Sequence, residues 1–301
     1  MSNAPFETKP VSLEDKTLFD LYFKKCRFLN SEFTFTNMFM WQKSYNIRYA
    51  EIDGNLCIFS KHGSDPESVN MSTFSGDVSA TVPKLLEYFK SIGQPPVIRL
   101  FGTEQKELLK KLFPNKFSFK KDVDSSDYVY NTEDLITLPS GKYHAKRNHI
   151  NKFKTLYEYK YHTMTPDFRE ECRRIFIRWC ESKRDSISNI DDQLDAVNCL
   201  LDNWEHLDIT GGCITVDGNM VAFSFGEVLC YPESIAVIHL EHADTNFHGS
   251  FSMINQQFLE HQWSDFKLIN REEDMGIEGL RKAKKSYHPC FLTAKYVATL
   301  K

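Results

Sequence analysis

Two Asp-Gly dipeptides constrain the fold of this chain more than any other feature. Asp53-Gly54 and Asp217-Gly218 each lie between two short runs rich in apolar residues. Asp-Gly favours the two-residue turn of a β-hairpin because both turn positions need a positive φ, which Asp and Gly tolerate. The runs that would form the strands are residues 47–50, 56–60, 213–216 and 221–228. The sequence therefore predicts an antiparallel hairpin in each half of the chain.

Helical and extended patterns follow one order around both hairpins: helices, hairpin, strand, helix, strand. Apolar residues at helical spacing predict helices over residues 13–26, 33–45, 82–92, 104–113, 140–154, 166–182 and 190–207, and again after Gly249 and Gly279. Further strands are predicted over residues 96–101, 117–130, 157–164, 235–240, 266–269 and 291–300. The aromatic-rich segment 33–45 suits either a buried helix or a lid over a groove. This order predicts an α/β fold of two units, residues 1–135 and 136–301, each with a mixed sheet flanked by helices.

The composition is that of a soluble globular protein, with 41% hydrophobic and 26% charged residues. A net charge of only −4 means that any anion site must come from a local cluster of cations. The eight cysteines contain no Cys-x-x-Cys pair, which argues against a zinc site and a disulfide framework. No stretch has the pattern of a membrane span or a signal peptide, so we expect a cytoplasmic protein.

The most basic window of the chain is the segment 140–154. Its cations are Lys142, Lys146, Arg147, Lys152 and Lys154, with no acidic residue between them. Their charge of +5 leaves −9 for the rest of a chain whose net charge is −4. Such a block is either a local anion site or a solvated helix face, and both alternatives stay open, because Tyr143, Ile150 and Phe153 give the segment a core-facing side.

Residues 269–289 combine an acidic triplet, two glycines and a basic helix. Charge follows directly after an apolar run, as happens where a buried strand leaves its sheet. Asp274 at that strand end is a solvated carboxylate, a general base for an amine nucleophile, or a group that binds an ammonium ion by charge alone. On a helical wheel Lys284 lies at the margin of the apolar face, Arg281 lies a little further round, and Lys282 points away. We therefore expect Lys284 to line a cleft.

Polar residues also end the apolar run 235–240. Glu241 at this strand end is either a solvated carboxylate or a general base for an amine nucleophile. His248-Gly249 then leads into a helix whose free N–H groups could hold an anion. Histidines gather in this region without metal-ligand spacing, so no metal is expected. The chain also has no P-loop, dinucleotide fingerprint or nucleophile signature, so covalent catalysis is not indicated.

Three longer motifs resemble a known family. They are Asp127-Tyr-Val-Tyr-Asn-Thr-Glu-Asp-Leu, Tyr143-His-Ala-Lys-Arg-Asn-His-Ile-Asn-Lys-Phe and Asn270-Arg-Glu-Glu-Asp-Met-Gly-Ile-Glu-Gly-Leu-Arg-Lys-Ala-Lys-Lys-Ser-Tyr-His-Pro. They look like motifs of the soluble bacterial family that shares the C-terminal domain of phosphatidylglycerol lysyltransferases. The resemblance implies two tandem acyltransferase folds of the GCN5-related N-acetyltransferase (GNAT) type, each a mixed, mostly antiparallel sheet flanked by helices. It also implies kinship with the Fem transferases that use aminoacyl-tRNA, whose C-terminal pattern maps onto Ala283, Lys284 and Tyr287.

The resemblance and the charge pattern together predict an acyl- or aminoacyltransferase that acts on an amine or hydroxyl acceptor. Glu241 and Asp274 are the expected catalytic residues. The residues expected to bind the donor are Lys142, Lys146, Arg147, His248, Gly249, Arg281 and Lys284. Aminoacyl-tRNA would meet such a basic surface through its phosphates, and acyl-CoA is the other donor considered. Two alternatives remain: a CoA-dependent N-acyltransferase of a small amine, and a non-catalytic anion- or RNA-binding module on the same fold.

Overall fold

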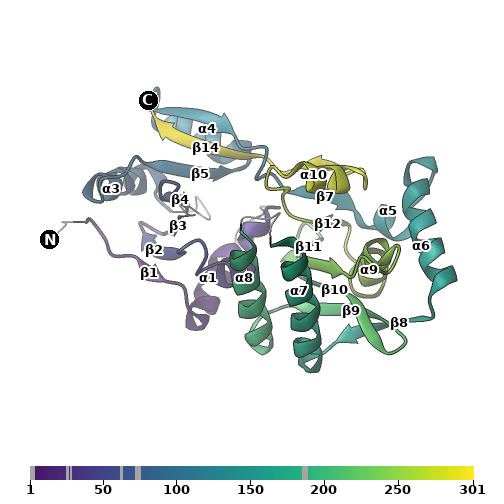
Figure 1. Ribbon diagram of the computed structural model, residues 1–301. Helices are drawn as coiled ribbons and strands as arrows, with labels where there is room; N and C mark the ends of the chain where they lie inside the picture. Colours follow the sequence, from purple (N-terminus) through teal and green to yellow (C-terminus); the bar gives the residue numbers. More distant parts are fainter. Residues whose placement is uncertain (1–3, 25–26, 28, 62–63, 72–75, 185–188) are drawn as a thin grey trace. The chain divides into compact units, whose positions relative to one another are not determined.

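The computed structural model describes residues 4–24, 27, 29–61, 64–71, 76–184 and 189–301 (Figure 1). The chain forms two compact units: the first holds Met1–Ser126 and Thr293–Lys301, and the second holds Asp127–Leu292. The expected division between residues 135 and 136 differs from this one in two respects. Residues 127–135 belong to the second unit, and the last strand returns to the first.

A seven-stranded sheet forms the framework of the first unit, in the order β1-β2-β3-β4-β5-β14-β6. The strands are β1 (Lys9–Pro10), β2 (Arg48–Ile52), β3 (Asn55–Ser60), β4 (Ser68–Met71), β5 (Val97–Phe101), β6 (Phe117–Lys121) and β14 (Lys295–Leu300). Neighbouring strands pair antiparallel except for β4 and β5, so the sheet is mixed and mostly antiparallel. Asp53 and Gly54 adopt φ values of 49° and 78° between β2 and β3. The first predicted hairpin is therefore confirmed.

Helices cover both faces of this sheet. They are α1 (Lys16–Phe23), α2 (Phe35–Met40), α3 (Val78–Ser91) and α4 (Gly102–Leu112). Phe89 of α3 packs in the same core as Ala50 of β2. The preceding residue, Tyr49, points to the other face, where its ring centre lies 5.2 Å from that of Phe19 in α1. Phe39 of α2 is buried, so the aromatic-rich segment forms the buried helix of the two alternatives.

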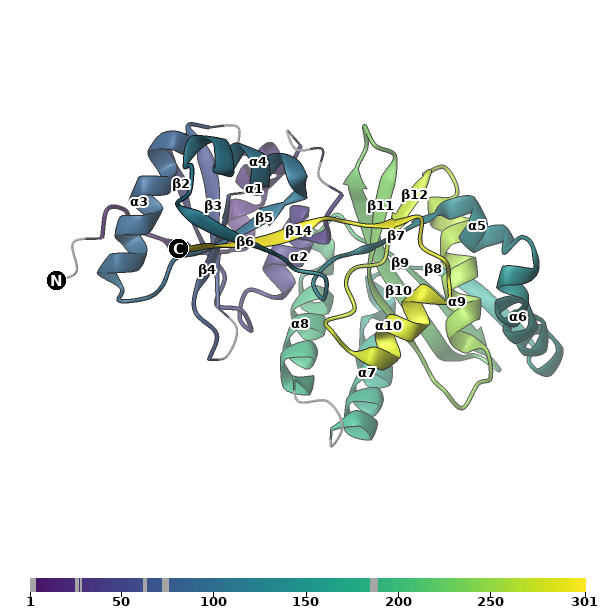
Figure 2. The same ribbon diagram turned by 90° about the horizontal axis from the view of Figure 1, so that it is seen from above.

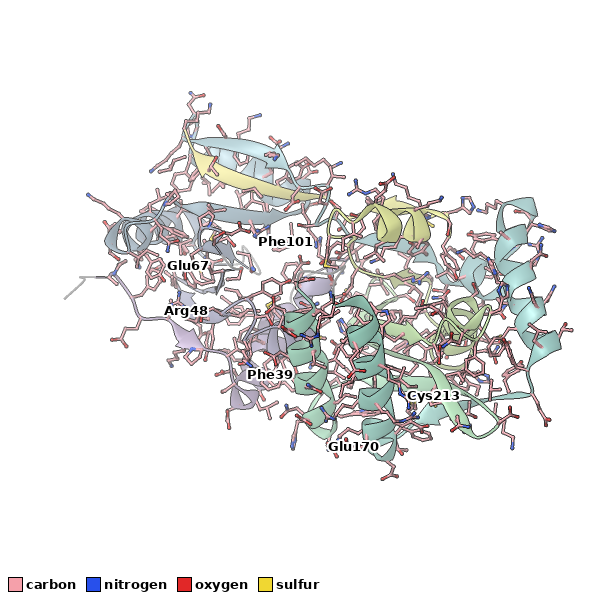
Figure 3. All side chains as sticks on the ribbon, in the orientation of Figure 1. Phe39, Arg48, Glu67, Phe101, Glu170 and Cys213 are labelled. Atoms are coloured by element: carbon pink, nitrogen blue, oxygen red, sulfur yellow. The ribbon has the colours of Figure 1, made fainter. Side chains whose placement is uncertain are left out.

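A buried polar cluster connects β2 to α3 in the first unit. Arg48 in β2 donates to Glu67, and the Tyr88 hydroxyl in α3 donates to the same carboxylate at 2.9 Å. Figure 3 shows where Arg48 and Glu67 lie in the first unit. Glu67 is buried, and these two donors satisfy its charge inside the protein. We assign this cluster to the architecture of the unit.

The second unit repeats the plan of the first, with the strand order β13-β7-β12-β11-β10-β9-β8. The strands are β7 (Tyr128–Asn131), β8 (Tyr159–Met164), β9 (Thr210–Val216), β10 (Asn219–Cys230), β11 (Ile235–Ala243), β12 (Leu268–Asn270) and β13 (Phe291–Leu292). Here β11 and β12 form the parallel pair, and the chain between them contains α9 (Ser250–Phe258), since parallel neighbours need a crossover. Asp217 and Gly218 adopt φ values of 50° and 77°. The second predicted hairpin and the antiparallel meander from β9 to β11 are confirmed.

Each sheet contains one strand from the other side of the expected boundary between residues 135 and 136. In the first sheet β14 lies between β5 and β6, and in the second sheet β7 lies between β12 and β13. The sequence predicts a single strand over residues 117–130 and another over residues 291–300, and both predictions are wrong. Each segment crosses between the sheets, because β6 and β7 belong to different sheets, as do β13 and β14.

Helices also cover both faces of the second sheet (Figure 2). They are α5 (Thr132–Thr137), α6 (His144–Leu156), α7 (Arg169–Lys183), α8 (Ile190–Asp202), α9 and α10 (Glu278–Lys285). Ala243 of β11 packs with Phe153 of α6 and Ile254 of α9 in one core. The preceding residue, His242, lies on the opposite face, with its ring centre 4.5 Å from that of Phe176 in α7. Within the described ranges, no helix is both long and apolar enough to cross a membrane.

Candidate functional site

A β-bulge in β11 decides which face of the second sheet receives Glu241. The pairing of β10 with β11 leaves His239 unopposed, between the partners of Phe225 and Gly226. One extra residue in a strand inverts the alternation of the side chains that follow it. Glu241 therefore points to the face covered by α9, where Asn255 of that helix contacts it.

Glu241 is held by two side chains on this face. Its Oε1 accepts a hydrogen bond from Nη2 of Arg271, and its Oε2 accepts one from Nδ2 of Asn255, both at 2.8 Å. The side chains of Glu241 and Arg271 are only 14% and 12% exposed. Arg271 follows β12, and its backbone N–H donates to the carbonyl of Tyr128 at 3.0 Å. The salt bridge is thus largely shielded from water. Its charges interact more strongly there than they would in water.

Lys146 of α6 and Arg271 both contact the aromatic ring of Tyr287. Nζ of Lys146 lies 3.9 Å from the centre of the Tyr287 ring, and the guanidinium carbon of Arg271 lies 4.7 Å from the same centre. Burial and the nearby Arg271 charge lower the pKa of Lys146 to about 8, although Glu241 acts in the opposite direction. Nη1 of Arg271 is buried and has no hydrogen-bond partner among the described residues.

We call Lys146, Glu241, Arg271 and Tyr287 the cationic cluster. Two cationic side chains here face one carboxylate, so with Lys146 protonated the cluster carries a net positive charge. A buried donor without a partner costs free energy until an acceptor satisfies it. The arrangement therefore suits a ligand that brings an anionic or carbonyl oxygen.

Asp274 anchors the segment that follows β12. Nε and Nη2 of Arg281 donate to its two carboxylate oxygens, both at 2.7 Å. The Tyr128 hydroxyl donates at 2.6 Å and the backbone N–H of Gly276 at 2.9 Å. Burial raises the pKa of this carboxyl, but the hydrogen bonds from Arg281 and Tyr128 outweigh burial and lower the pKa to about 2. A carboxylate with so low a pKa accepts a proton poorly at neutral pH.

Lys284 is partly buried, whereas Lys282 on the same helix is exposed. Nζ of Lys284 donates to the backbone carbonyl of Arg271 at 2.6 Å and also to that of Glu273. Burial lowers the pKa of Lys284. Its ammonium group therefore supports the backbone that carries Arg271.

His239 at the bulge lies between two carboxylates. Its Nε2 is 2.8 Å from Oε1 of Glu227, and its Nδ1 is 2.8 Å from Oε1 of Glu272. Burial opposes a charge on the imidazole, but the hydrogen bonds to the two glutamates raise the pKa of His239 to about 10. Glu272 has a φ of 57°, which a non-glycine residue adopts only when its surroundings hold it there. The imidazolium thus helps to hold the residue next to Arg271.

The other predicted donor-binding residues lie outside the cationic cluster. Lys142 forms an ion pair with Asp134 at 3.7 Å, with both side chains partly exposed. Arg147 donates to backbone carbonyls of the preceding loop. His248 and Gly249 lie at the start of α9, where Gly249 has a φ of 88°.

The structure brings Lys146 and Glu241 into one cluster and joins Asp274 to Arg281 in a second. The sequence reasoning missed Arg271, which contacts both Glu241 and Tyr287. A usable signal was present, because Arg271 follows the buried strand β12 just as Asp274 does. The three acidic residues that follow Arg271 dominate the charge of this segment.

Comparison with known proteins shows to which family this chain is similar. The profile of the family described as "Phosphatidylglycerol lysyltransferase, C-terminal" matches residues 23–299. A conserved protein of unknown function from Bacteroides thetaiotaomicron VPI-5482 has a similar crystal structure, with 34% identity and a TM-score of 0.90 over 98% of this chain and 99% of that one. An uncharacterized protein of Mycoplasmoides gallisepticum is 24% identical over 186 residues. That match covers 58% of this chain and only 56% of the length of the relative.

More distant structures share the fold. L-PGS from Bacillus licheniformis has a TM-score of 0.65 at 14% identity, over 97% of this chain and 92% of that one. FemX has a TM-score of 0.62 at 10% identity, over 98% of both chains. A tandem GNAT protein from the clavulanic acid biosynthesis pathway has a TM-score of 0.52 at 7% identity, over 97% and 98%. The predicted fold class, two tandem GNAT-like units, is confirmed.

Proposed function

We propose that this chain, which belongs to the family of phosphatidylglycerol lysyltransferase C-terminal domains, transfers an aminoacyl group from an anionic donor to an amine or hydroxyl acceptor. The observation that carries the proposal is the cationic cluster, in which Lys146 and Arg271 flank one ring beside Glu241. Aminoacyl-tRNA is the proposed donor. Its ester carbonyl oxygen and its phosphate oxygens can accept hydrogen bonds from the cationic side chains of the cluster and of the basic helix α6.

Acyl transfer needs three things from a protein: position, removal of a proton and stabilisation of an oxyanion. The acceptor atom forms a bond to the carbonyl carbon while the carbonyl oxygen takes up negative charge. The ester C–O bond then breaks, and the departing hydroxyl takes a proton. In the proposed mechanism Lys146 as an ammonium stabilises the oxyanion and supplies that proton, and Arg271 binds the donor through Nη1.

Glu241 takes the proton of the acceptor in this mechanism. Each of its carboxylate oxygens accepts one hydrogen bond from the neighbouring side chains, and a second lone pair remains on each. Asp274 takes a different role from the catalytic one that the sequence suggests. With Arg281 and Lys284 it holds the backbone that carries Arg271, and we propose that these three are positioning residues.

The decisive experiment measures transfer of a labelled amino acid from tRNA. The family name makes lysyl-tRNA with vesicles that contain phosphatidylglycerol the first pair to test, followed by other aminoacyl-tRNAs with small amines and peptides. Lys146→Met should lower the rate by about 100-fold or more, because one charged group at a developing oxyanion supplies about 3 kcal/mol. Lys160→Met, on the exposed part of β8, is the matched control and should behave like the wild type. Full activity of Lys146→Met would refute the assigned role.

The pH profile tests the protonation state of Lys146. Since its pKa is lowered to about 8, the ammonium form is lost as the pH rises through that value. The rate should therefore fall above a pH of about 8. In Lys146→Arg, which keeps its charge, the fall should disappear or move to higher pH, and an unchanged profile would assign the titration to another group.

Donor binding should depend steeply on salt. Lys142, Lys152 and Lys154 are exposed on and near α6 and can contact phosphates. Affinity for aminoacyl-tRNA should fall with the logarithm of the salt concentration, with a slope close to the number of phosphates neutralised. Affinity that does not respond to salt would contradict this donor. Heat released with acetyl-CoA at millimolar concentration would instead favour the CoA-dependent alternative, and binding of tRNA without turnover would favour the non-catalytic one.

A further inference from the structure

Two exposed histidines from distant parts of the sequence face each other at the start of α9. His149 lies on α6, and His248 immediately precedes Gly249. Nδ1 of His149 is 3.3 Å from Nε2 of His248, and the ring centres are 5.2 Å apart with an angle of 46° between the planes. The proposed transfer reaction uses neither ring.

The distance between the two nitrogens fits a shared metal ion. Without a metal the two nitrogens form a long hydrogen bond whose donor depends on the tautomer, at 3.3 Å against the usual value of about 2.9–3.0 Å. Two imidazole nitrogens bound to one tetrahedral Zn²⁺ at about 2.0–2.1 Å each would lie about 3.3–3.4 Å apart, and their ring centres about 5 Å apart. Both expected separations agree with those between His149 and His248.

The backbone holds the two histidines at this spacing. A Cβ added to Gly249 would lie 2.3 Å from the carbonyl oxygen of His149, so α6 and the start of α9 are in backbone contact. The backbone N–H of His248 also donates to the Tyr157 hydroxyl at 3.3 Å. These backbone contacts keep the two rings next to each other.

The surroundings of the pair limit its affinity for a metal. The neighbouring cations Lys146 and Lys152 oppose a bound cation, and the described residues contain no group of three or more His, Cys, Asp or Glu side chains placed to hold one. Such a site leaves coordination positions open to water and has a modest affinity.

We infer that His149 and His248 form a two-histidine site for a late first-row divalent transition metal ion such as Zn²⁺ or Ni²⁺. Imidazole nitrogen prefers these ions to Mg²⁺ and Ca²⁺, which prefer oxygen ligands. A bound ion would connect α6, which carries Lys146, to the start of α9. The sequence shows no sign of this site because the two ligands are 99 residues apart.

The test is calorimetric titration of the untagged, chelator-treated full chain with ZnCl₂ and NiCl₂. The exposed thiol of Cys290 is removed in all samples by Cys290→Ser, so that it cannot compete for the metal. We expect one ion per chain with micromolar affinity at pH 7.5, because two imidazole ligands leave the other coordination positions to water. MgCl₂ should release no binding heat.

Matched variants identify the ligands. His149→Ala and His248→Ala should each weaken Zn²⁺ binding at least tenfold, whereas His144→Ala, exposed on the same helix, should leave it unchanged. Zn²⁺ should raise the thermal unfolding midpoint of the parent and the His144→Ala variant only, because an ion that binds the folded state stabilises it. The proposal fails if the parent binds no Zn²⁺ at 1 mM, or if binding survives in both His149→Ala and His248→Ala. It also fails if Mg²⁺ binds as tightly as Zn²⁺.

Discussion

At the scale of single residues, Asp274 is the ionic anchor of the segment between β12 and α10. Asp274→Asn keeps the shape of the side chain but removes the charge that Arg281 and Tyr128 compensate. We expect it to lower the free energy of unfolding by about 3 kcal/mol, since one partner of a buried pair is then left unmatched. Urea unfolding followed by tryptophan fluorescence measures this, because Trp179, Trp204 and Trp263 lie in the second unit.

Lowering the pH tests the contribution of the Asp274 carboxylate to stability in a second way. The pKa of Asp274 is lowered to about 2 from an ordinary value of 3.8, so its contribution to stability is present above pH 3.8 and lost as the pH falls towards 2. The stability difference between the wild type and Asp274→Asn should shrink over that range. Glu278→Gln, at an exposed position of α10, is the control and should change stability by less than about 0.5 kcal/mol. A neutral effect of Asp274→Asn at pH 7 would show that the anchor is dispensable.

Because of His239, the stability of the second unit should fall as the pH rises into the alkaline range. The pKa of His239 is raised from 6.5 to about 10, so the contribution of its charge is fully present below pH 6.5 and is lost as the pH rises to about 10. His239→Gln should destabilise the second unit by about 3 kcal/mol at pH 6, with a smaller effect at pH 10. Unfolding in urea at both pH values measures the difference. A constant difference would mean that the imidazole stays neutral between Glu227 and Glu272.

At the scale of elements, the contact between α6 and α9 depends on a single glycine. Gly249 has a φ of 88°, and a Cβ at this position would lie 2.3 Å from the backbone oxygen of His149. Gly249→Ala should therefore separate the two helices and lower stability by more than about 2 kcal/mol. It should also lower the proposed transferase activity, because Lys146 lies on α6.

Gly279 provides the matched control for this substitution. It lies within α10, its φ is not positive, and a Cβ there would meet no atom within 4 Å. Gly279→Ala should leave the fold intact and raise stability by about 0.5–1 kcal/mol, since alanine favours the helix. Thermal unfolding of the two variants distinguishes a steric effect at Gly249 from a general effect of adding a methyl group. Equal midpoints would contradict the predicted close approach.

At the scale of the whole molecule, the first unit is built from two separate segments of the chain, residues 1–126 and 293–301. Residues 1–126 alone lack β14, which pairs with both β5 and β6 in the first sheet. A fragment of residues 1–126 should therefore remain largely unfolded, because its sheet loses an interior strand. Residues 127–292 contain every strand of the second sheet, and this fragment should fold by itself. Far-ultraviolet circular dichroism and the cooperativity of thermal unfolding measure both outcomes.

Restoring the missing strand is the control for this prediction. Lys121 at the end of β6 lies opposite Tyr296 in β14, so a short Gly-Ser linker can join residue 126 to Thr293–Lys301. The joined chain should regain a cooperative unfolding transition. Cooperative folding of residues 1–126 without β14 would show that the strand is an addition to a sheet that is already stable.

The sequence by itself determined the local elements of this protein. Both Asp-Gly hairpins and most helices were predictable, because the φ preferences of Asp and Gly and the spacing of apolar residues act within a few residues. The motifs also indicated the family and its tandem fold. Helical periodicity alone predicted that Lys282 points away from the protein, and this side chain is exposed.

Only the tertiary structure decided how distant segments meet. The strand order of a sheet depends on pairings between residues far apart in sequence, so one extended run per segment could not reveal that β6 and β7 belong to different sheets. The bulge at His239 turned Glu241 towards Arg271, a partner that no local pattern specifies. The 3.3 Å approach of His149 to His248 has the same origin. Periodicity tells which way a side chain points from its own element, whereas the packing of several elements decides what it meets.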